Sequence, residues 1–87
     1  MELFYIKDWL EHNLSELLFE KANNTTKRRA EYRISKIMNM LWKRGKVDDW
    51  NYKVSVIIPN YITPYLNANI EMIHYNKANE NINMRIG

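Results

Sequence analysis

The sequence predicts an α+β fold in which two amphipathic helices are followed by a small three-stranded sheet. In the first half of the chain, apolar residues recur at steps of three and four, the period of a helix buried on one side. After Gly45 the period changes to two, as in strands with one buried face. The 87 residues allow one domain, residues 1–87, with no repeat and no linker.

The first predicted helix covers residues 2–20. Its apolar stripe consists of Leu3, Ile6, Leu10, Leu14 and Leu17, widened by Phe4, Trp9 and Leu18. The segment KANNTT then ends the helix, because Asn and Thr favour turns and helix caps.

The second predicted helix covers residues 26–44. Its buried face is predicted to consist of Ala30, Ile34, Ile37, Met38 and Leu41. Gly45 follows Lys43 and Arg44, a composition that helix C-termini prefer because glycine adopts positive φ and cations complement the helix dipole.

The predicted strands cover residues 50–58, 69–75 and 80–86, and Pro59 and Pro64 bound a polar loop between the first two. Their alternating residues are Trp50, Tyr52, Val54, Val56 and Ile58, then Ile70, Met72 and His74, then Ile82, Met84 and Ile86. The last strand either pairs only within its own sheet or joins the sheet of a neighbouring molecule by strand addition.

The net charge of +3 is unevenly distributed. Residues 1–20 carry five acids and one base, whereas residues 27–46 carry eight bases and one acid. On the second helix, Arg29, Arg33, Lys36 and Lys43 follow steps of four, three and seven and form one basic stripe. This stripe is compatible with a solvated face, an acidic protein partner or nucleic acid. Two helices without a short connecting turn disfavour a helix-turn-helix, while a winged helix stays open.

The candidate chemical groups predict no enzyme, no cofactor and no metal. The chain has no cysteine, which excludes disulfides, thiolate ligands and a cysteine nucleophile. His12 and His74 lack a spaced ligand partner for zinc, and two glycines cannot build a phosphate loop. Asp48 and Asp49 are adjacent and more plausibly form a turn than a catalytic dyad. No apolar segment reaches membrane length, and the charged start is unlike a signal peptide.

Three segments in order carry a resemblance to a known family: FEKANNTTKRR (19–29), MLWKRGKVDDWNYKVSV (40–56) and NANIEMIHYNKANENINMRI (67–86). Together they resemble the C-terminal domain of contractile-tail sheath proteins, found in bacteriophages and related injection machines. The residues that match the first and last family segments, with one or two residues of slippage in the first, are Phe19, Glu20, Asn23, Asn24, Thr26 and Arg28, then Lys77, Glu80 and Ile82. Asn76 stands where the family has a proline.

The resemblance implies a structural protein that assembles by strand exchange between subunits and lies next to the inner tail tube. It implies that Lys27, Arg28, Arg29, Arg33 and Lys36 face an acidic tail tube protein. It further implies an inter-subunit strand formed by Glu80, Ile82, Met84 and Ile86, so that strands from neighbouring subunits complete the sheet. Removal of residues 80–87 is then predicted to abolish polymerisation and to leave the helices folded.

The partners that the resemblance implies are neighbouring sheath-type subunits and the tube protein, with baseplate or neck proteins as further candidates. Neither a membrane nor nucleic acid is expected as a partner. The implied location is the virion tail, and the host cytoplasm during assembly.

Two departures keep alternatives open. Full sheath subunits are several times longer, so the chain is a sheath fragment, a minimal sheath or a small relative. The baseplate sheath initiators share the fold and are near this size, but their Glu-Pro-Arg triplet is absent where this chain has RGKVDDW (44–50). The alternative from a different class is a small basic nucleic-acid-binding protein.

Overall fold

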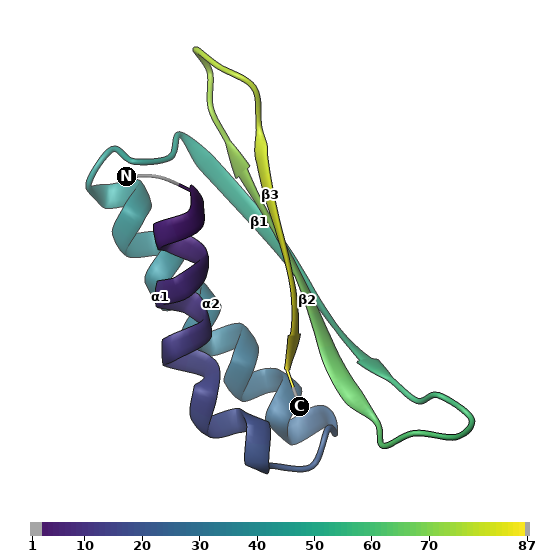
Figure 1. Cartoon of the computed structure of the whole chain (residues 1–87). Helices are drawn as coiled ribbons and strands as arrows, with labels where there is room; N and C mark the ends of the chain where they lie inside the picture. The colour runs from purple at the N-terminus through teal and green to yellow at the C-terminus, as the bar shows by residue number, and fades with distance from the viewer. Residues whose placement is uncertain (1–2, 87) are drawn as a thin grey trace.

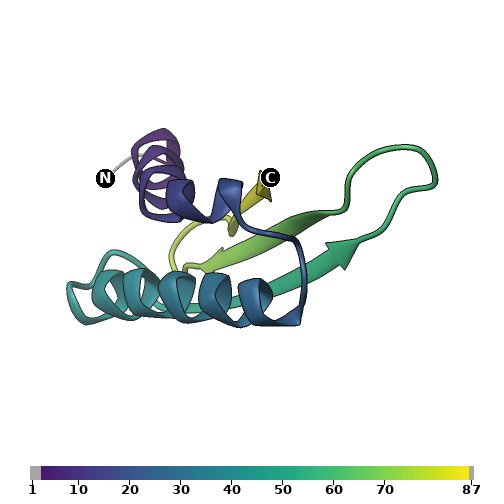
Figure 2. The ribbon, with the colours of Figure 1, turned by 90° about the horizontal axis from the view of Figure 1, so that it is seen from below.

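The computed structural model describes residues 3–86 and consists of two layers, with the helices covering one face of the sheet (Figures 1 and 2). The elements follow in the order α1 (Leu3–Leu14), the 3-10 helix η1 (Ser15–Phe19), α2 (Asn24–Lys43), β1 (Asp49–Ile57), β2 (Tyr65–Ile73) and β3 (Glu80–Ile86). The predicted α+β class is therefore confirmed. No helix within residues 3–86 is long and apolar enough to cross a membrane.

The first helix is not the single helix predicted over residues 2–20. α1 ends at Leu14, and the chain continues as the tighter helix η1. Two side chains bond to α1 carbonyls at this point: Asn13 Nδ2 donates to Trp9 O at 2.8 Å and Ser15 Oγ donates to His12 O at 2.7 Å. Such local bonds compete with the helical ladder and favour a change of helix type. Residue 2 lies outside the described residues, and so do the side chains of Leu3, Phe4 and Leu18, which the predicted stripe included.

The second helix has a defined cap at each end. The amide of Thr26 donates to the side chain of Asn23 at 3.0 Å, so α2 begins at Asn24, two residues before the predicted start. At the other end Gly45 has φ of +73°, and its amide bonds Trp42 O at 3.0 Å. The amide of Lys46 bonds Leu41 O at 2.9 Å, which completes a Schellman motif around Gly45. α2 ends at Lys43, one residue before the predicted end.

The sheet is an antiparallel meander in the order β1-β2-β3, in which Ile70 of β2 lies between Tyr52 and Ile82. β2 begins at Tyr65, four residues before the predicted start at residue 69. Asn67 was predicted to lie in the loop. It lies instead in β2, on the polar face of the sheet, and the neighbouring Leu66 pairs with Val56 of β1. Cross-strand pairing therefore outweighs local turn preference.

The other strand ends also differ from the prediction. β2 stops at Ile73 rather than at residue 75, because the amides of His74 and Tyr75 bond the side chains of Asn79 and Asp48 at 3.3 and 2.8 Å. β1 spans Asp49–Ile57, so Asp49 belongs to a strand rather than to the predicted turn. Ile58, predicted as a strand residue, lies beyond β1 and is exposed.

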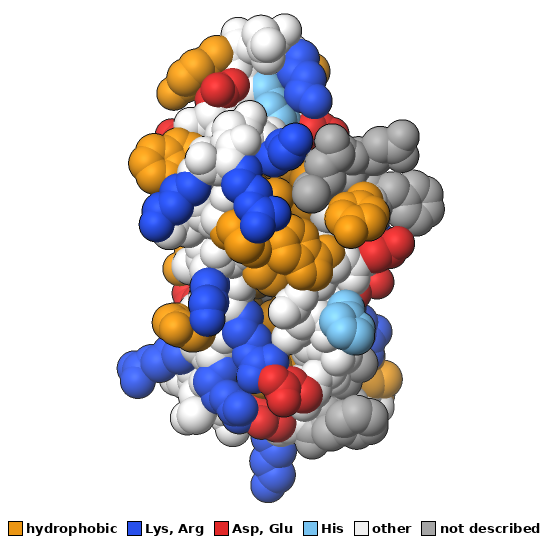
Figure 3. Space-filling view, turned by 90° about the vertical axis from the view of Figure 1, so that its left-hand side faces the viewer, with side chains coloured by type: hydrophobic (Ala, Val, Ile, Leu, Met, Phe, Trp, Pro, Cys, Tyr) orange, Lys and Arg blue, Asp and Glu red, His pale blue; other side chains and the backbone are white. Residues whose placement is uncertain are grey.

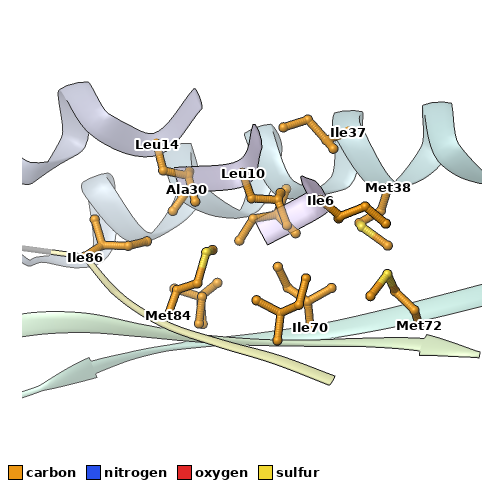
Figure 4. Packing of buried hydrophobic residues seen from close by; sticks show 14 of the residues in the cluster. Ile6, Leu10, Leu14, Ala30, Ile37, Met38, Ile70, Met72, Met84 and Ile86 are labelled. Carbon is orange, nitrogen blue, oxygen red and sulfur yellow. The ribbon is translucent and has the colours of Figure 1, made fainter. Parts of the chain in front are cut away.

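One hydrophobic core fills the space between the two layers (Figure 4). α1 packs against β3 and α2 packs against β1. The predicted buried residues of both helices are confirmed wherever their side chains are described, and Trp9 is half-buried against the core. The opposite face of the sheet is mostly polar, with Ile57, Tyr65 and Ile73 toward its ends, and there the side chain of Asn51 donates to Glu71 at 2.8 Å. The helical layer thus covers only one side of the sheet.

Candidate assembly surfaces

The basic run of α2 divides into paired and unpaired cations. Arg29 forms an ion pair with Glu20, and Arg33 forms one with Glu16. Arg33 also donates from Nη1 to the carbonyl of Asn13 at 2.9 Å. Two of the five residues predicted to contact the tube therefore bind the preceding helical segment of the same chain.

The sequence contained a signal for these internal pairs. Glu16 and Glu20 are four residues apart, and so are Arg29 and Arg33, which is the spacing of neighbours on one helix face. The acidic residues 1–20 and the basic residues 27–46 therefore contact each other within the molecule, which explains part of the uneven charge distribution. Because all four side chains are partly exposed, each pair contributes only about 0.2–1 kcal/mol to stability.

The other three predicted tube-binding residues make no ion pair within residues 3–86. They are Lys27, which is half-buried, and Arg28 and Lys36, which are exposed. Arg28, Tyr32 and Lys36 follow each other at steps of four and so share one face of α2. Arg28 and Tyr32 line a shallow hollow of about 300 Å³ together with the paired Arg29 and Arg33. We call Arg28 and Lys36, together with Lys27 on the neighbouring side of the helix, the cationic face.

The predicted inter-subunit strand is part of the chain's own sheet. Ile82, Met84 and Ile86 are buried in the core, and Glu80 accepts from His74 Nε2 at 2.8 Å and pairs with Lys77 at 3.5 Å. β3 nevertheless pairs only with β2, so its outer backbone edge has no strand partner within residues 3–86. The structure thus assigns the side chains of β3 to the core and leaves its outer edge open.

A hollow of about 300 Å³ lies beside this edge, between α1 and β3. Its apolar lining comes from Leu14, Met84 and Ile86, and its rim from Glu11 and Arg85. Leu14, Met84 and Ile86 are also core residues, so the hollow continues the hydrophobic core past the last strand. We call this feature the edge hollow. Sequence patterns could not reveal it, because its lining joins the first helix to the last strand.

Neither histidine lies in a cluster of potential metal ligands within the described residues. His74 bonds Glu80, and His12 is exposed. Within the described residues, no group of three or more His, Cys, Asp or Glu side chains could hold a metal ion. Comparison of the chain with protein-family models, curated proteins and solved structures gives no match.

Proposed function

We propose that the chain is a non-enzymatic structural module of a contractile tail, of the sheath type, which assembles by strand addition and contacts the inner tube through α2. The edge of β3 carries the proposal. Among the described residues this edge pairs with no strand, and the edge hollow beside it has an apolar floor continuous with the core. The order and spacing of the sequence segments that resemble the sheath family add support.

The edge of β3 fits a strand from a neighbouring molecule on physical grounds. An added strand would satisfy the outer N–H and C=O groups of β3, and every second side chain would point toward the helical layer. There it would meet Leu14 and Ile86 in the edge hollow and extend the hydrophobic core. Because the added strand and the edge that receives it are different surfaces, the contact is head to tail. It gives a ring where the rotation closes, and an open helical row, as a sheath requires, where it does not.

Filling the edge hollow is expected to block assembly without removing any core side chain. Glu11 is exposed on the rim, so Glu11→Trp places an indole where an added strand would insert its side chains. We expect the wild-type chain to form rings or tubes that grow with concentration, and the Glu11→Trp variant to form neither. Light scattering across a wide concentration range, with electron microscopy of large species, measures both.

Glu11→Ala is the matched control, because it removes the same weak ion pair with Lys7 but leaves the hollow empty. It is expected to assemble like the wild type. Assembly of the Glu11→Trp variant at wild-type concentrations would exclude strand addition at β3. A wild-type chain that is monomeric at every concentration would favour the initiator alternative over a self-assembling sheath.

Reversing the cationic face is expected to weaken binding to the tail tube. The change is Lys27, Arg28 and Lys36 to Glu, which spares Arg29 and Arg33 because their reversal would disturb internal pairs. Attraction between exposed charges is screened by salt, so the loss of tube binding is expected to be largest at low ionic strength. Co-sedimentation with assembled tubes measures it.

Lys53→Glu serves as the control, because Lys53 is exposed on the polar face of the sheet, away from the helices. Equal binding by the triple variant and the control would remove the cationic face from the tube interface. The nucleic-acid alternative has a different signature: affinity for duplex DNA whose logarithm falls with the logarithm of salt by about 0.9 per phosphate contacted.

A further inference from the structure

The loop between β1 and β2 exposes apolar side chains at one end of the molecule. We call residues 58–64, IPNYITP, the hairpin tip. Its large apolar residues are unusually accessible: Tyr61 is 98% exposed, Ile58 76% and Ile62 55%. Figures 1 and 2 show this loop extending beyond the helical layer. Clustered exposed apolar residues indicate a binding surface. Pro59 and Pro64 restrict the backbone of the loop, so binding costs less conformational entropy.

A receptive surface for such a tip lies on the helical layer. Tyr5, Asp8, Trp9 and His12 of α1 and Arg44 at the end of α2 line a hollow of about 420 Å³. We call it the aromatic hollow. Trp9 packs against the core, so its ring has a fixed support. Figure 3 shows hydrophobic side chains gathered in the middle of this face, with Lys and Arg side chains beside them.

The hairpin tip cannot reach the aromatic hollow of its own chain. Arg44 lies just before β1, whereas the tip begins immediately after β1 ends. The nine residues of β1, at about 3.3 Å each, separate the two surfaces by roughly 30 Å. The molecule is elongated, with extents of 43 × 21 × 19 Å, and the two surfaces lie toward opposite ends. A contact between them must therefore join two copies head to tail.

We propose that Tyr61 of one copy inserts into the aromatic hollow of a second copy of this chain. The chemistry of the two surfaces matches group by group. The ring of Tyr61 would pack on Trp9 and Tyr5. The guanidinium of Arg44 would lie over the face of the Tyr61 ring. Asp8 would accept a hydrogen bond from the Tyr61 hydroxyl. The uncharged tip places no like charge against Asp8 or Arg44.

This contact deepens the proposed assembly and rests on it for its biological use. Tip and hollow are different surfaces, so each copy offers one of each and the contact propagates head to tail, as a ring or as an open row. It uses neither β3 nor the edge hollow. Strand addition and tip insertion are therefore separable by experiment.

Cysteine cross-linking tests the contact directly, since the chain has no cysteine. N60C in the tip is mixed with H12C at the aromatic hollow under mild oxidation. A seated tip raises the effective concentration of the two thiols, so this pair is expected to form mixed dimers about tenfold faster than the control pair N76C and H12C. N76C is the control because Asn76 is exposed in the other hairpin loop. Equal rates for the two pairs would overturn the proposal.

Substitution of the tip residue gives a second, independent test. Tyr61→Ala is expected to weaken self-association about tenfold, because removal of a central aromatic anchor typically has at least this effect. Tyr75→Ala is the matched control, a tyrosine 81% exposed in the β2–β3 loop, and should change nothing. Equal effects of Tyr61→Ala and Tyr75→Ala on self-association would overturn the proposal. Cross-linking of N60C to a tail tube protein, but not to H12C, would overturn it as well. Persistence of the N60C–H12C cross-link in the Glu11→Trp background would show that tip insertion holds where strand addition fails.

Discussion

Leu10→Ala is expected to lower the free energy of unfolding by about 3 kcal/mol, because deletion of a buried Leu side chain loses transfer free energy and leaves a cavity. Leu10 is fully buried and lies between α2 and the sheet (Figure 4). A chain of this size has a total stability of between about 4 and about 13 kcal/mol. The change therefore removes a large part of it.

Urea denaturation measures this loss as a lower transition midpoint with an unchanged slope. Tyr32→Ala on the exposed side of α2 is the control, and surface changes of this kind stay within about 0.5 kcal/mol. A cost below about 1 kcal/mol for Leu10→Ala would mean that α1 does not dock on the core as described. Both assembly surfaces would then lose their support, since the edge hollow and the aromatic hollow each include residues of α1.

The sequence predicted the fold well wherever burial is periodic along the chain. Ile34 and Leu41 are buried because a helix that covers a sheet on one side must place apolar residues at helical steps. Gly45 marked the end of α2 because a Schellman motif needs positive φ there. Such features depend on local geometry, so local patterns reveal them.

The assembly surfaces depend on which distant elements meet, and no local pattern contains that information. The edge hollow combines Leu14 with Ile86, and the aromatic hollow combines Tyr5 with Arg44. The basic stripe was predicted from spacing alone, yet Arg33 turns out to hold Glu16 and the carbonyl of Asn13. These contacts depend on where the end of α1 and η1 lie in the folded chain, which spacing along α2 cannot predict. Charge complementarity between neighbouring helices is therefore the first alternative to weigh when a basic helix follows an acidic one.

Removal of residues 80–87 is expected to unfold the whole chain rather than to leave folded helices, which reverses the outcome predicted from the sequence. The deletion takes away Ile82, Met84 and Ile86, which are buried under α1. Burial of each is worth about 2 kcal/mol, so the loss is about 6 kcal/mol. It also removes the hydrogen bonds between β2 and β3, and Leu66 and Ile70 of β2 would become exposed to water. The total stability is between about 4 and about 13 kcal/mol, so the lost burial alone takes about half of it at the upper bound and exceeds it at the lower bound.

Circular dichroism through a thermal transition measures the effect, and the truncated chain is expected to show no cooperative unfolding. The control changes Asn81 and Asn83 to Ser on the polar face of β3, where the side chains are exposed, and should keep the transition. A truncated chain that unfolds cooperatively would mean that β3 is dispensable for the fold, and that its apolar side chains are free to serve a neighbour. The same result would revive a model in which β3 itself is exchanged. Loss of the transition instead leaves the outer edge of β3, and not its side chains, as the part of this strand that can join another molecule.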